Sequence, residues 1–307
     1  MIPVIGFDEG EAGLDWLGLT QALAAGHDLP RAEQSDSFLY RGRDTLLNRA
    51  AWIDGLGLAV KSATIFPGNP PDRPAVNGGV SLYSDRDGTL EAVIDFHLVT
   101  KWKTAADSLL AALRLARPDS RTILIVGAGT VAHNLRAAYG AGFPEARFLV
   151  WARRPDAARA FAAAHPATDW AESLEDAVAR ADIVTSATMA TEPLIRGDWL
   201  RPGQHLDLIG AYRPDMREAD DAALCRSRLF VDSRASVLAH IGELAIPIAA
   251  GVVAGTDVVA DFYDLPSGRF VRGGADEITL FKNGGGAHLD LMTARHILEV
   301  WRARTGG

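Results

Sequence analysis

Cysteine is nearly absent from this chain of 307 residues, which contains one, Cys225. A single cysteine excludes an internal disulfide and a zinc site built on several thiolates. The stretch around it, residues 220–225, has a helical pattern, so we expect Cys225 to be a small buried apolar residue rather than a nucleophile. The eight histidines are scattered, and the closest pair, His288 and His296, does not share one helical turn. We therefore predict no metal site.

Long apolar runs and an excess of positive charge are also missing. No run approaches the roughly 20 apolar residues that a membrane helix needs, and the N-terminus lacks the basic-then-apolar order of a signal peptide. We therefore expect a cytoplasmic protein with no membrane partner. The formal net charge of −8 argues against non-specific binding to nucleic acid, which requires clustered positive charge. The length and the apolar fraction of 48% are ordinary for a globular protein of two domains.

What the sequence does contain is a glycine-rich turn between an apolar run and a helical pattern. Residues 123–126 predict a buried parallel strand, and residues 130–139 carry alanine and leucine at helical spacing. Gly127 permits a tight turn, and Gly129 removes the side chain that would keep the backbone away from a pyrophosphate. The start of the helix offers unpaired N–H groups to an anion. This order of strand, turn and helix predicts a dinucleotide site.

The next predicted strand indicates which dinucleotide binds. Residues 147–152 run into Arg153 and Arg154, with no carboxylate before Asp156. An acidic residue at this strand end would accept hydrogen bonds from the adenosine ribose of NAD. Two guanidinium groups suit a 2′-phosphate instead, because their planar donor fork matches phosphate oxygens. We therefore predict NADP (NADPH) in preference to NAD. The alternative is a solvated arginine pair with no role in binding.

The order of elements after residue 122 predicts the fold class. Strands and helices alternate there, which is typical of an α/β fold with a Rossmann-type doubly wound parallel sheet. Ligands of such sheets lie beyond the carboxyl ends of the strands, so residues 186–191 and 210–214 are of interest. Ser173 and Asp176 form a capping box that opens a helix. Residues 255–276 show little periodicity and predict a long loop. Further strands are expected at residues 182–188, 205–210, 229–232 and 279–283, and helices at residues 155–165 and 287–302.

The first part of the chain has a different pattern. After a helical stretch at residues 16–25, turn residues recur every eight to twelve positions, which predicts an antiparallel sheet or partial barrel. Residues 85–88 form a good hairpin turn. Thr104 and Asp107 have the form of a capping box, so we expect a helix at residues 108–116, followed by a boundary. The strands of this sheet are expected at residues 37–40, 45–53, 58–66, 76–83 and 90–96.

Three lysines outside the predicted dinucleotide domain lie near the ends of predicted elements. Lys61 follows a strand, and Lys101 and Lys103 precede a helix. A cationic cluster in an acidic protein would hold an anionic substrate, most simply a carboxylate. A solvated lysine at a helix start is unfavourable to the helix dipole, whereas for Lys61 alone a surface position is the better expectation. The spacing does not show whether the three side chains converge.

Several motifs make the chain similar to the ornithine cyclodeaminase and mu-crystallin family over nearly its whole length. The resemblance implies a homodimer in which residues 1–117 with 292–307 form a mixed α+β substrate-binding and dimerisation domain, and residues 118–291 form the Rossmann dinucleotide-binding domain. It also implies NAD(P) chemistry at the carbon–nitrogen bond of a small amino or imino acid. The motifs lie at residues 57–61, 98–106, 126–129, 187–193, 202–205, 209–214, 231–233 and 279–284.

The resemblance also implies a set of site residues. The lysine of the family's substrate site falls on Lys61, as a catalytic residue, and its carboxylate-binding arginine falls on Lys103, which keeps the charge but loses the bidentate fork. A second, N-terminal arginine corresponds best to Arg31, although the alternatives Arg41, Arg43 and Arg49 stay open. The candidate substrate-binding residues are Arg31, Lys103, Tyr212, Asn283 and Gly284. The candidate cofactor-binding residues are Gly127, Gly129, Thr130, Val131, Arg153, Arg154, Thr188, Met189 and Ala211.

Two departures separate this chain from the ornithine cyclodeaminases it resembles. Those enzymes carry an aspartate after the fifth strand, where it handles the amino group of ornithine, and this chain has Tyr212 there. They also carry a glutamate shortly before a Met-Pro pair, and this chain has Leu-Leu-Asn-Arg at residues 46–49. Without these carboxylates the ammonium group of a diamino acid would lack counter-charges, and burying an unpaired charge is costly. The resemblance therefore favours the imine reductases of the family.

The leading hypothesis is reduction of a small cyclic imino acid by NADPH. The substrate would be Δ1-pyrroline-2-carboxylate or its six-membered homologue Δ1-piperideine-2-carboxylate, giving L-proline or L-pipecolate. Lys103 and an N-terminal arginine would hold the carboxylate, and Lys61 would orient the substrate or supply a proton. Deamination, by ornithine cyclisation or alanine dehydrogenation, is the alternative reaction. A non-catalytic protein that binds NADPH or a small ligand is an alternative of another class.

Overall fold

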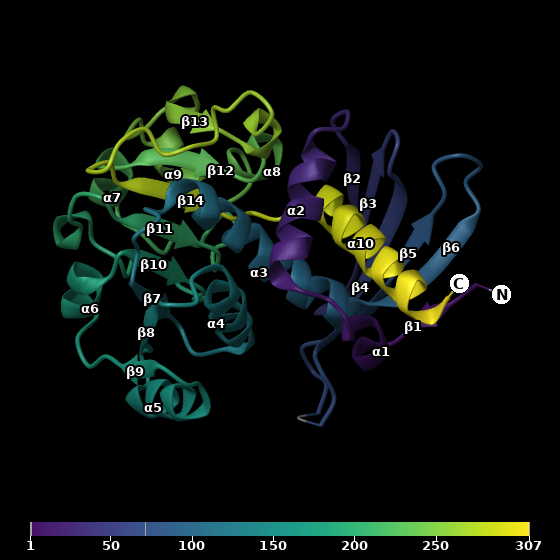
Figure 1. The fold of residues 1–307 in the computed structure, drawn as a ribbon, viewed down its shortest axis with the longest axis horizontal. Helices are drawn as coiled ribbons and strands as arrows, with labels where there is room; N and C mark the ends of the chain where they lie inside the picture. Colours follow the sequence, from purple (N-terminus) through teal and green to yellow (C-terminus); the bar gives the residue numbers. More distant parts are fainter. Residues whose placement is uncertain (1, 71, 307) are drawn as a thin grey trace. The chain divides into compact units, whose positions relative to one another are not determined.

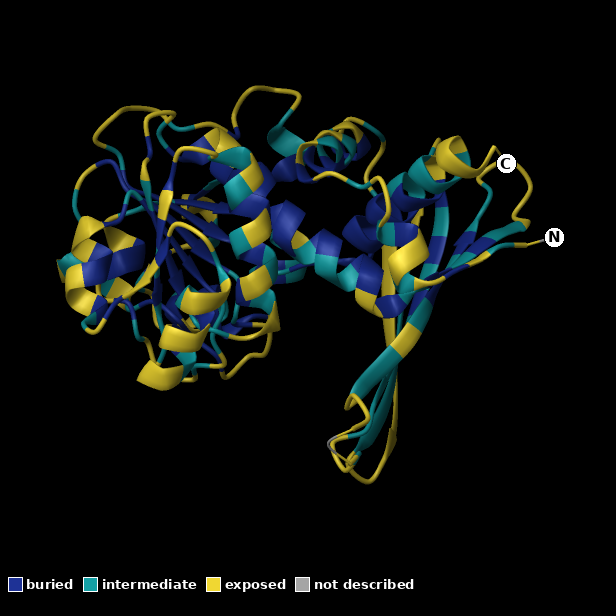
Figure 2. Ribbon diagram, turned by 60° about the horizontal axis from the view of Figure 1, so that its bottom comes forward, coloured by how far each residue is buried: buried dark blue, intermediate teal, exposed yellow. Residues whose placement is uncertain are grey.

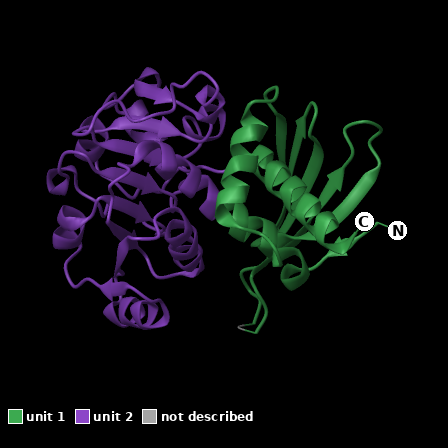
Figure 3. Cartoon of the chain, in the orientation of Figure 1, with its two compact units in different colours: residues 1–104, 286–307 green, residues 105–285 purple. Residues whose placement is uncertain are grey.

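The computed structural model describes residues 2–70 and 72–306 and divides into two compact units (Figure 3). Unit 1 contains residues 1–104 and 286–307, and unit 2 contains residues 105–285. The sequence analysis placed the divisions after residues 117 and 291. The first division differs because helix α3 (Phe96–Leu115) runs through residue 104 without a break. Residues 1 and 307, which end the predicted substrate domain, lie outside the described residues.

Unit 1 is built on a sheet that has six strands within the described residues (Figure 1). The predicted antiparallel sheet is confirmed, because every neighbouring pair from β6 to β2 is antiparallel, and only the short β1 pairs in parallel with β6. The predicted hairpin turn at residues 85–88 joins β5 to β6, and Gly88 has a φ of +70° there. The spatial order is β1 (Val4–Ile5), β6 (Leu90–Asp95), β5 (Val76–Tyr83), β4 (Gly57–Ile65), β3 (Asp44–Ile53) and β2 (Glu33–Arg41).

Helix α10 (Ala287–Thr305) crosses one face of this sheet and contacts β3, β4 and β5 (Figure 1). It also contacts α2 (Trp16–His27), and α1 (Phe7–Glu11) packs at its far end. In β4, buried and partly exposed positions alternate, because successive side chains point to opposite faces of a strand (Figure 2). The buried positions face α10. The edge strand β2 is exposed along its whole length.

Helix α3 begins at Phe96, so the predicted start beyond Thr104 is wrong. Asp95 precedes the helix, and its Oδ1 accepts a hydrogen bond of 2.8 Å from the backbone N–H of Leu98. This side chain caps the helix in the way that an N-terminal aspartate does. Asp107, the other half of the predicted capping box, is fully buried in the helix interior. The strand β6 passes into α3 without a loop, so no turn residue marks the true start.

Unit 2 contains a parallel sheet with eight strands in the described chain. The predicted Rossmann-type doubly wound sheet is confirmed. The strand order reverses between β7 and β10, and ligands of such sheets bind at this switch point, beyond the carboxyl ends of the strands. The order is β13 (Val258–Ala260), β12 (Arg228–Val231), β14 (Thr279–Lys282), β11 (His205–Leu208), β10 (Ile183–Ser186), β7 (Thr122–Val126), β8 (Arg147–Trp151) and β9 (Thr168–Trp170).

Helices cover both faces of the parallel sheet. Helices α4 and α6 lie on opposite sides of the central strands in Figure 1. Ile123, Leu124, Ile125 and Val126 of β7 are therefore all fully buried, as in a strand covered on both faces. As predicted, Ser173 caps α6, and its Oγ accepts a hydrogen bond of 3.1 Å from the N–H of Asp176. The helices are α4 (Thr130–Gly142), α5 (Pro155–Ala164), α6 (Leu174–Arg180), α7 (Asp221–Cys225), α8 (Arg234–Val237) and α9 (Gly242–Ala249).

Two details of unit 2 differ from the sequence analysis. Cys225 is exposed rather than buried, because α7 has only five residues and buries Ala223 and Leu224, which leaves the last position outside. The predicted long loop at residues 255–276 contains a strand, β13, and two single turns of 3-10 helix. Strand β13 is ordered by its pairing with β12, a contact that no apolar periodicity in this segment indicates. Among the described residues, no helix combines the length and apolar character needed to cross a membrane.

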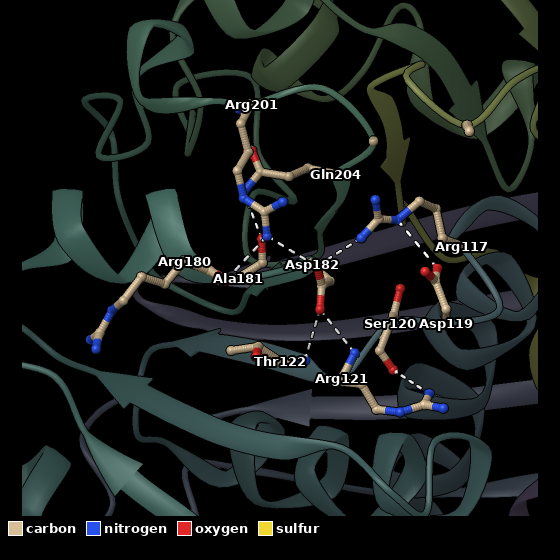
Figure 4. Close-up of polar contacts among 12 residues, drawn as sticks. Arg117, Asp119, Ser120, Arg121, Thr122, Arg180, Ala181, Asp182, Arg201 and Gln204 are labelled. Carbon is tan, nitrogen blue, oxygen red and sulfur yellow. Dashed lines mark hydrogen bonds and ion pairs between the residues drawn. The ribbon is translucent and has the colours of Figure 1, made fainter.

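Asp182 binds residues at the amino ends of β7 and β10 (Figure 4). The switch point lies at the opposite, carboxyl ends of these strands. The Oδ2 of Asp182 accepts hydrogen bonds from the backbone N–H groups of Arg121 at 2.9 Å and Thr122 at 3.0 Å. Its Oδ1 lies 3.0 Å from a guanidinium nitrogen of both Arg117 and Arg201. Burial would raise the pKa of Asp182, but these donors lower it below its usual value. We assign this cluster a structural role.

Candidate functional site

The turn between β7 and α4 has the backbone that a dinucleotide requires. Gly127 has a φ of +113°, which glycine adopts without strain, and a Cβ there would lie 2.7 Å from the carbonyl oxygen of Ala187. A Cβ added at Gly129 would meet no atom within 4 Å, so this position faces open space. Helix α4 begins at Thr130, and no side chain caps it. The uncapped N–H groups and the open backbone fit a pyrophosphate.

This turn borders a cavity of about 600 Å³ in unit 2. Thr130 and Val131, at the start of α4, do not line it, and neither does the buried Ala211. Six of the nine predicted cofactor-binding residues do line it, namely Gly127, Gly129, Arg153, Arg154, Thr188 and Met189. Three segments that are far apart in the sequence therefore form one cavity, at the switch point of the sheet.

Arg153 and Arg154 lie on the cavity wall directly after β8, and both are exposed. The nearest following carboxylate, Asp156, lies 2.9 Å from a guanidinium nitrogen of Arg159. Within residues 2–70 and 72–306, neither Arg153 nor Arg154 forms an ion pair. Both guanidinium groups are therefore available to an anionic ligand in the cavity.

Glu218, which the sequence analysis did not single out, joins the two loops that follow β10 and β11. Its Oε1 accepts hydrogen bonds from the Ser186 hydroxyl at 2.6 Å and from the Thr188 N–H and hydroxyl, both at 2.8 Å. Its Oε2 accepts from the N–H of Gly210 at 2.6 Å and of Ala211 at 3.3 Å. The side chain is fully buried. Glu218 therefore fixes Thr188 in the cavity wall, although it lies in a segment without periodicity.

Two further buried ionisable groups support Glu218. Glu243 accepts hydrogen bonds from the N–H of Glu218 at 2.7 Å and of Ala219 at 3.0 Å. Burial, and then the charge of Glu218, raise the pKa of Glu243 to about 7. Lys282 donates to the carbonyl of Leu208 at 2.8 Å. Burial lowers the pKa of Lys282, and the nearby carboxylates, led by Glu218, oppose this effect.

Asn283 and Gly284, two predicted substrate-binding residues, contribute to the packing of unit 2. The Asn283 amide donates a hydrogen bond of 3.0 Å to the hydroxyl of Ser108. The N–H of Gly284 donates to Asp232 at 2.9 Å, and a Cβ at Gly284 would lie 2.5 Å from a methyl group of Val237. Neither residue lines the dinucleotide cavity.

Lys61, in unit 1, is buried in β4 and pairs with a carboxylate. Its Nζ lies 2.9 Å from Oδ1 of Asp290 in α10, and the two side chains are 9% and 2% exposed. The same nitrogen lies 4.8 Å from the centre of the Phe96 ring. Burial lowers the pKa of Lys61, the charge of Asp290 opposes this effect, and the charges of Lys103 and Arg49 add to it.

Asp290 is a second residue that the sequence analysis missed. Burial would raise its pKa, but the charges of Lys61, Lys103 and Arg49 hold the pKa below its usual value. Within the described chain, its Oδ2 makes no hydrogen bond. The one signal in the sequence is an acidic residue between two leucines, Leu289 and Leu291, which is unusual on a buried helix face.

Lys103 is buried in the interior of α3, rather than solvated at a helix start. It influences the pKa of both Lys61 and Asp290, so these three residues form a cluster in unit 1. The third predicted lysine, Lys101, lies outside this cluster and pairs with Glu11 at 2.5 Å. The spacing of the lysines did not reveal this arrangement.

Among the four candidate arginines, Arg49 lies opposite Lys61 in the pairing of β3 with β4. It also pairs with Asp36 at 3.1 Å. Arg31 is exposed before β2 and contributes to the low pKa of His288. Arg41 pairs with Asp44 at 2.9 Å in the exposed β2–β3 hairpin. Arg49 therefore belongs to the cluster of Lys61, and the assignment of Arg31 stays a prediction.

The family model of the ornithine cyclodeaminase/mu-crystallin family matches residues 53–305. This chain belongs to that family. It is 49% identical, over 304 residues and 96% of both chains, to a Δ1-pyrroline-2-carboxylate reductase of Paracoccus denitrificans (strain Pd 1222). Its structure resembles that of the Δ1-pyrroline-2-carboxylate reductase of Thermococcus litoralis in complex with NADH and L-proline. The TM-score is 0.89 at 26% identity, over 100% of this chain and 98% of that one. An archaeal alanine dehydrogenase dimer with bound NAD gives the same TM-score of 0.89 at 25% identity, over 99% and 97% of the two chains.

Tyr212 lies in the loop after β11, at the position where the sequence comparison with ornithine cyclodeaminases expects an aspartate. Tyr212 is 56% exposed, and its ring centre lies 5.5 Å from the guanidinium carbon of Arg213. It does not line the dinucleotide cavity. The predicted role of Tyr212 in substrate binding stays a prediction.

Proposed function

We propose that this protein is an NADPH-dependent reductase of Δ1-pyrroline-2-carboxylate or Δ1-piperideine-2-carboxylate, which gives L-proline or L-pipecolate in the cytoplasm. The observation that carries the proposal is the 49% identity, over 96% of both chains, to a relative named as a Δ1-pyrroline-2-carboxylate reductase. The similar structure that contains NADH and L-proline supports the same reaction class. The buried cationic cluster of unit 1 supports a substrate that carries a carboxylate.

The cavity of unit 2 is the proposed cofactor site. Gly127 and Gly129 would accept the pyrophosphate, and Arg153 and Arg154 would bind the 2′-phosphate that distinguishes NADP from NAD. Thr188, fixed by Glu218, would contact the cofactor from the loop after β10. When bound, NADPH supplies the hydride that adds to the imine carbon and is itself oxidised to NADP.

The cationic cluster of unit 1 is the proposed substrate site. Lys103 and an arginine, Arg49 or Arg31, would hold the carboxylate through charge-assisted hydrogen bonds. Lys61 would donate a proton to the imine nitrogen, and the imine carbon would receive the hydride. The carbon–nitrogen double bond would thereby become a single bond. Lys61 then regains a proton from water. Its lowered pKa suits this role, because a general acid is most effective when its pKa lies near the working pH.

The first experiment measures loss of NADPH and of NADH with each imine, in parallel with ammonia release from ornithine. We expect faster loss of NADPH with one of the imines. Ammonia release without imine reduction would overturn the proposal in favour of deamination. Tight NADPH binding without consumption of either imine would favour a non-catalytic binding protein.

The variant Lys61→Ala tests the proposed proton donor. We expect turnover to fall by about 10²–10⁴-fold, the usual contribution of a general acid. NADPH affinity should stay unchanged, because Lys61 does not line the proposed cofactor cavity. Normal turnover in this variant would remove Lys61 from the mechanism.

We also propose that the protein is a homodimer that uses the face of the unit 1 sheet not covered by α10. Trp52 on this face is 48% exposed. Next to it, Val60 and Leu58 line an open hollow of about 500 Å³. On the same face, the neighbouring edge strand β2 exposes Leu39, which pairs with Leu46 of β3. Exposed apolar surface of this extent is typical of protein interfaces, and one similar structure is a dimer.

A further inference from the structure

The ion pair between Lys61 and Asp290 connects two distant parts of the sequence in a buried place. The residues are 229 positions apart, and the Nζ–Oδ1 distance is 2.9 Å. Both side chains are more than nine-tenths buried. Burying two charges costs more free energy than an apolar pair of similar size, so such a pair is weak evidence of a role in stability alone.

We propose that Asp290 is a positioning residue that keeps the Lys61 ammonium group protonated and oriented, and that it thereby sets the upper pH limit of the reaction. The inference rests on the proposed function, in which Lys61 donates the proton. It assigns to Asp290 no contact with the substrate.

The groups around Lys61 explain why a counter-ion is needed. Lys103 from α3 and Arg49 from β3 carry like charges, which favour the neutral amine. The Phe96 ring, also from α3, stabilises the cation weakly through its π face. On β5 the position paired with Lys61 is the apolar Val80. Asp290 from α10 is the acid among the charged groups that shift the pKa of Lys61.

The direction of each effect follows from these charges. Without the carboxylate of Asp290, Lys61 would lose its proton at a lower pH, because two cations and burial would act unopposed. Without the charge of Lys103, Lys61 would keep its proton to a higher pH. A purely structural ion pair would shift the Lys61 pKa in the same way but would leave the pH profile of the reaction unchanged, so the pH profile separates the two roles.

The first test measures the titration of Lys61 without any substrate. Competitive acylation across a pH series, read by mass spectrometry of the Lys61 peptide, gives its pKa in the intact protein. In Asp290→Asn we expect this pKa to fall by about one to three pH units, the usual effect of one nearby charge. In Lys103→Met we expect it to rise. An unchanged Lys61 titration in both variants would overturn the proposal.

The second test is the pH profile of kcat/KM for imine reduction. In Asp290→Asn the alkaline limb should move to lower pH, and in Asp290→Glu, which keeps the charge, it should stay closer to that of the wild type. Glu11→Gln is the matched control, because it breaks the Lys101–Glu11 pair in the same unit, outside the cluster. A circular dichroism spectrum and a melting temperature like those of the wild type would show that each variant is folded.

The two tests separate the failure of this inference from the failure of the proposed function. If the Lys61 titration shifts and the alkaline limb does not, Lys61 is not the proton donor and the inference is overturned. If the protein reduces neither imine, the proposed function fails, whereas the acylation experiment still tests the pairing of Asp290 with Lys61. Shifts of both quantities in the stated directions support the inference.

Discussion

At the scale of single residues, the proposed preference for NADP over NAD rests on Arg153 and Arg154. Both guanidinium groups line the dinucleotide cavity, and no carboxylate ends β8. Hydrogen bonds to a charged group contribute about 1.5–3 kcal/mol each. A side chain that contacts only the 2′-phosphate contributes to the binding of NADPH and not to that of NADH, which lacks this group.

Replacing both arginines by alanine should therefore lower kcat/KM for NADPH by about 10²–10⁴-fold and leave kcat/KM for NADH nearly unchanged. The measurement is the ratio of the two values in wild type and variant. Arg159→Ala is the control, since Arg159 is an exposed arginine of α5 that pairs with Asp156 outside the cavity lining. An unchanged ratio would mean that the arginine pair is merely solvated.

The sequence supplied candidate site residues but not the partners that the structure gives them. Lys61, Lys103 and the glycine turn could be named, because a motif or a local pattern marks each of them. Asp290 and Glu218 could not, because their roles depend on partners that are distant in the chain. Glu218, for example, receives hydrogen bonds from loops that follow two different strands.

At the scale of elements, the loops after β10 and β11 depend on Glu218. Four hydrogen-bond donors in these loops, and the Ser186 hydroxyl at the end of β10, bind its buried carboxylate. The variant Glu218→Gln places an amide N–H₂ against some of these donors and leaves Lys282 with one fewer counter-charge. Thr188 would then lose its fixed place in the cavity wall.

We expect Glu218→Gln to lower the free energy of unfolding by about 3–5 kcal/mol, the usual effect of disrupting a buried charged network. It should also weaken NADPH binding. Urea unfolding and titration of NADPH fluorescence measure the two effects. Glu172→Gln is the control, because Glu172 is an exposed glutamate of the same unit that does not line the cavity. Equal NADPH affinity in the two variants would argue against a role of Glu218 in the site.

Element types were predictable where the pattern is local. The antiparallel sheet of unit 1 was predicted from the spacing of turn residues, and the alternation in unit 2 from apolar runs and helical spacing. The start of α3 was not predicted, because β6 passes into the helix at Asp95 without a turn. A sequence that resembles a capping box lies nine residues later, at Thr104, and led to the wrong start. Short elements such as β9 and β13 were missed, since a strand of three residues has no period to detect.

At the scale of the whole molecule, a substitution on the sheet face not covered by α10 tests whether this face forms the proposed dimer interface. Val60 lines the hollow on this face, so Val60→Glu would place a charge in the interface. An unpaired buried charge costs several kcal/mol, and we expect this variant to be a monomer by light scattering coupled to gel filtration. Val271→Glu, at an exposed position of unit 2, is the control and should remain dimeric. A dimeric Val60→Glu would mean that another surface associates.

The organisation of the chain has a consequence for its synthesis. Unit 2 is one continuous segment, residues 105–285, whereas unit 1 combines the beginning of the chain with residues 286–307. Helix α10, which covers β3, β4 and β5, is translated after the whole of unit 2. The sheet of unit 1 must therefore wait, with its future core exposed, for about 10–40 s while roughly 200 residues are added at 5–20 residues per second. Lys61 acquires its counter-ion only after α10 has been translated, so a nascent chain without α10 holds a complete unit 2 and a unit 1 sheet whose core is still uncovered.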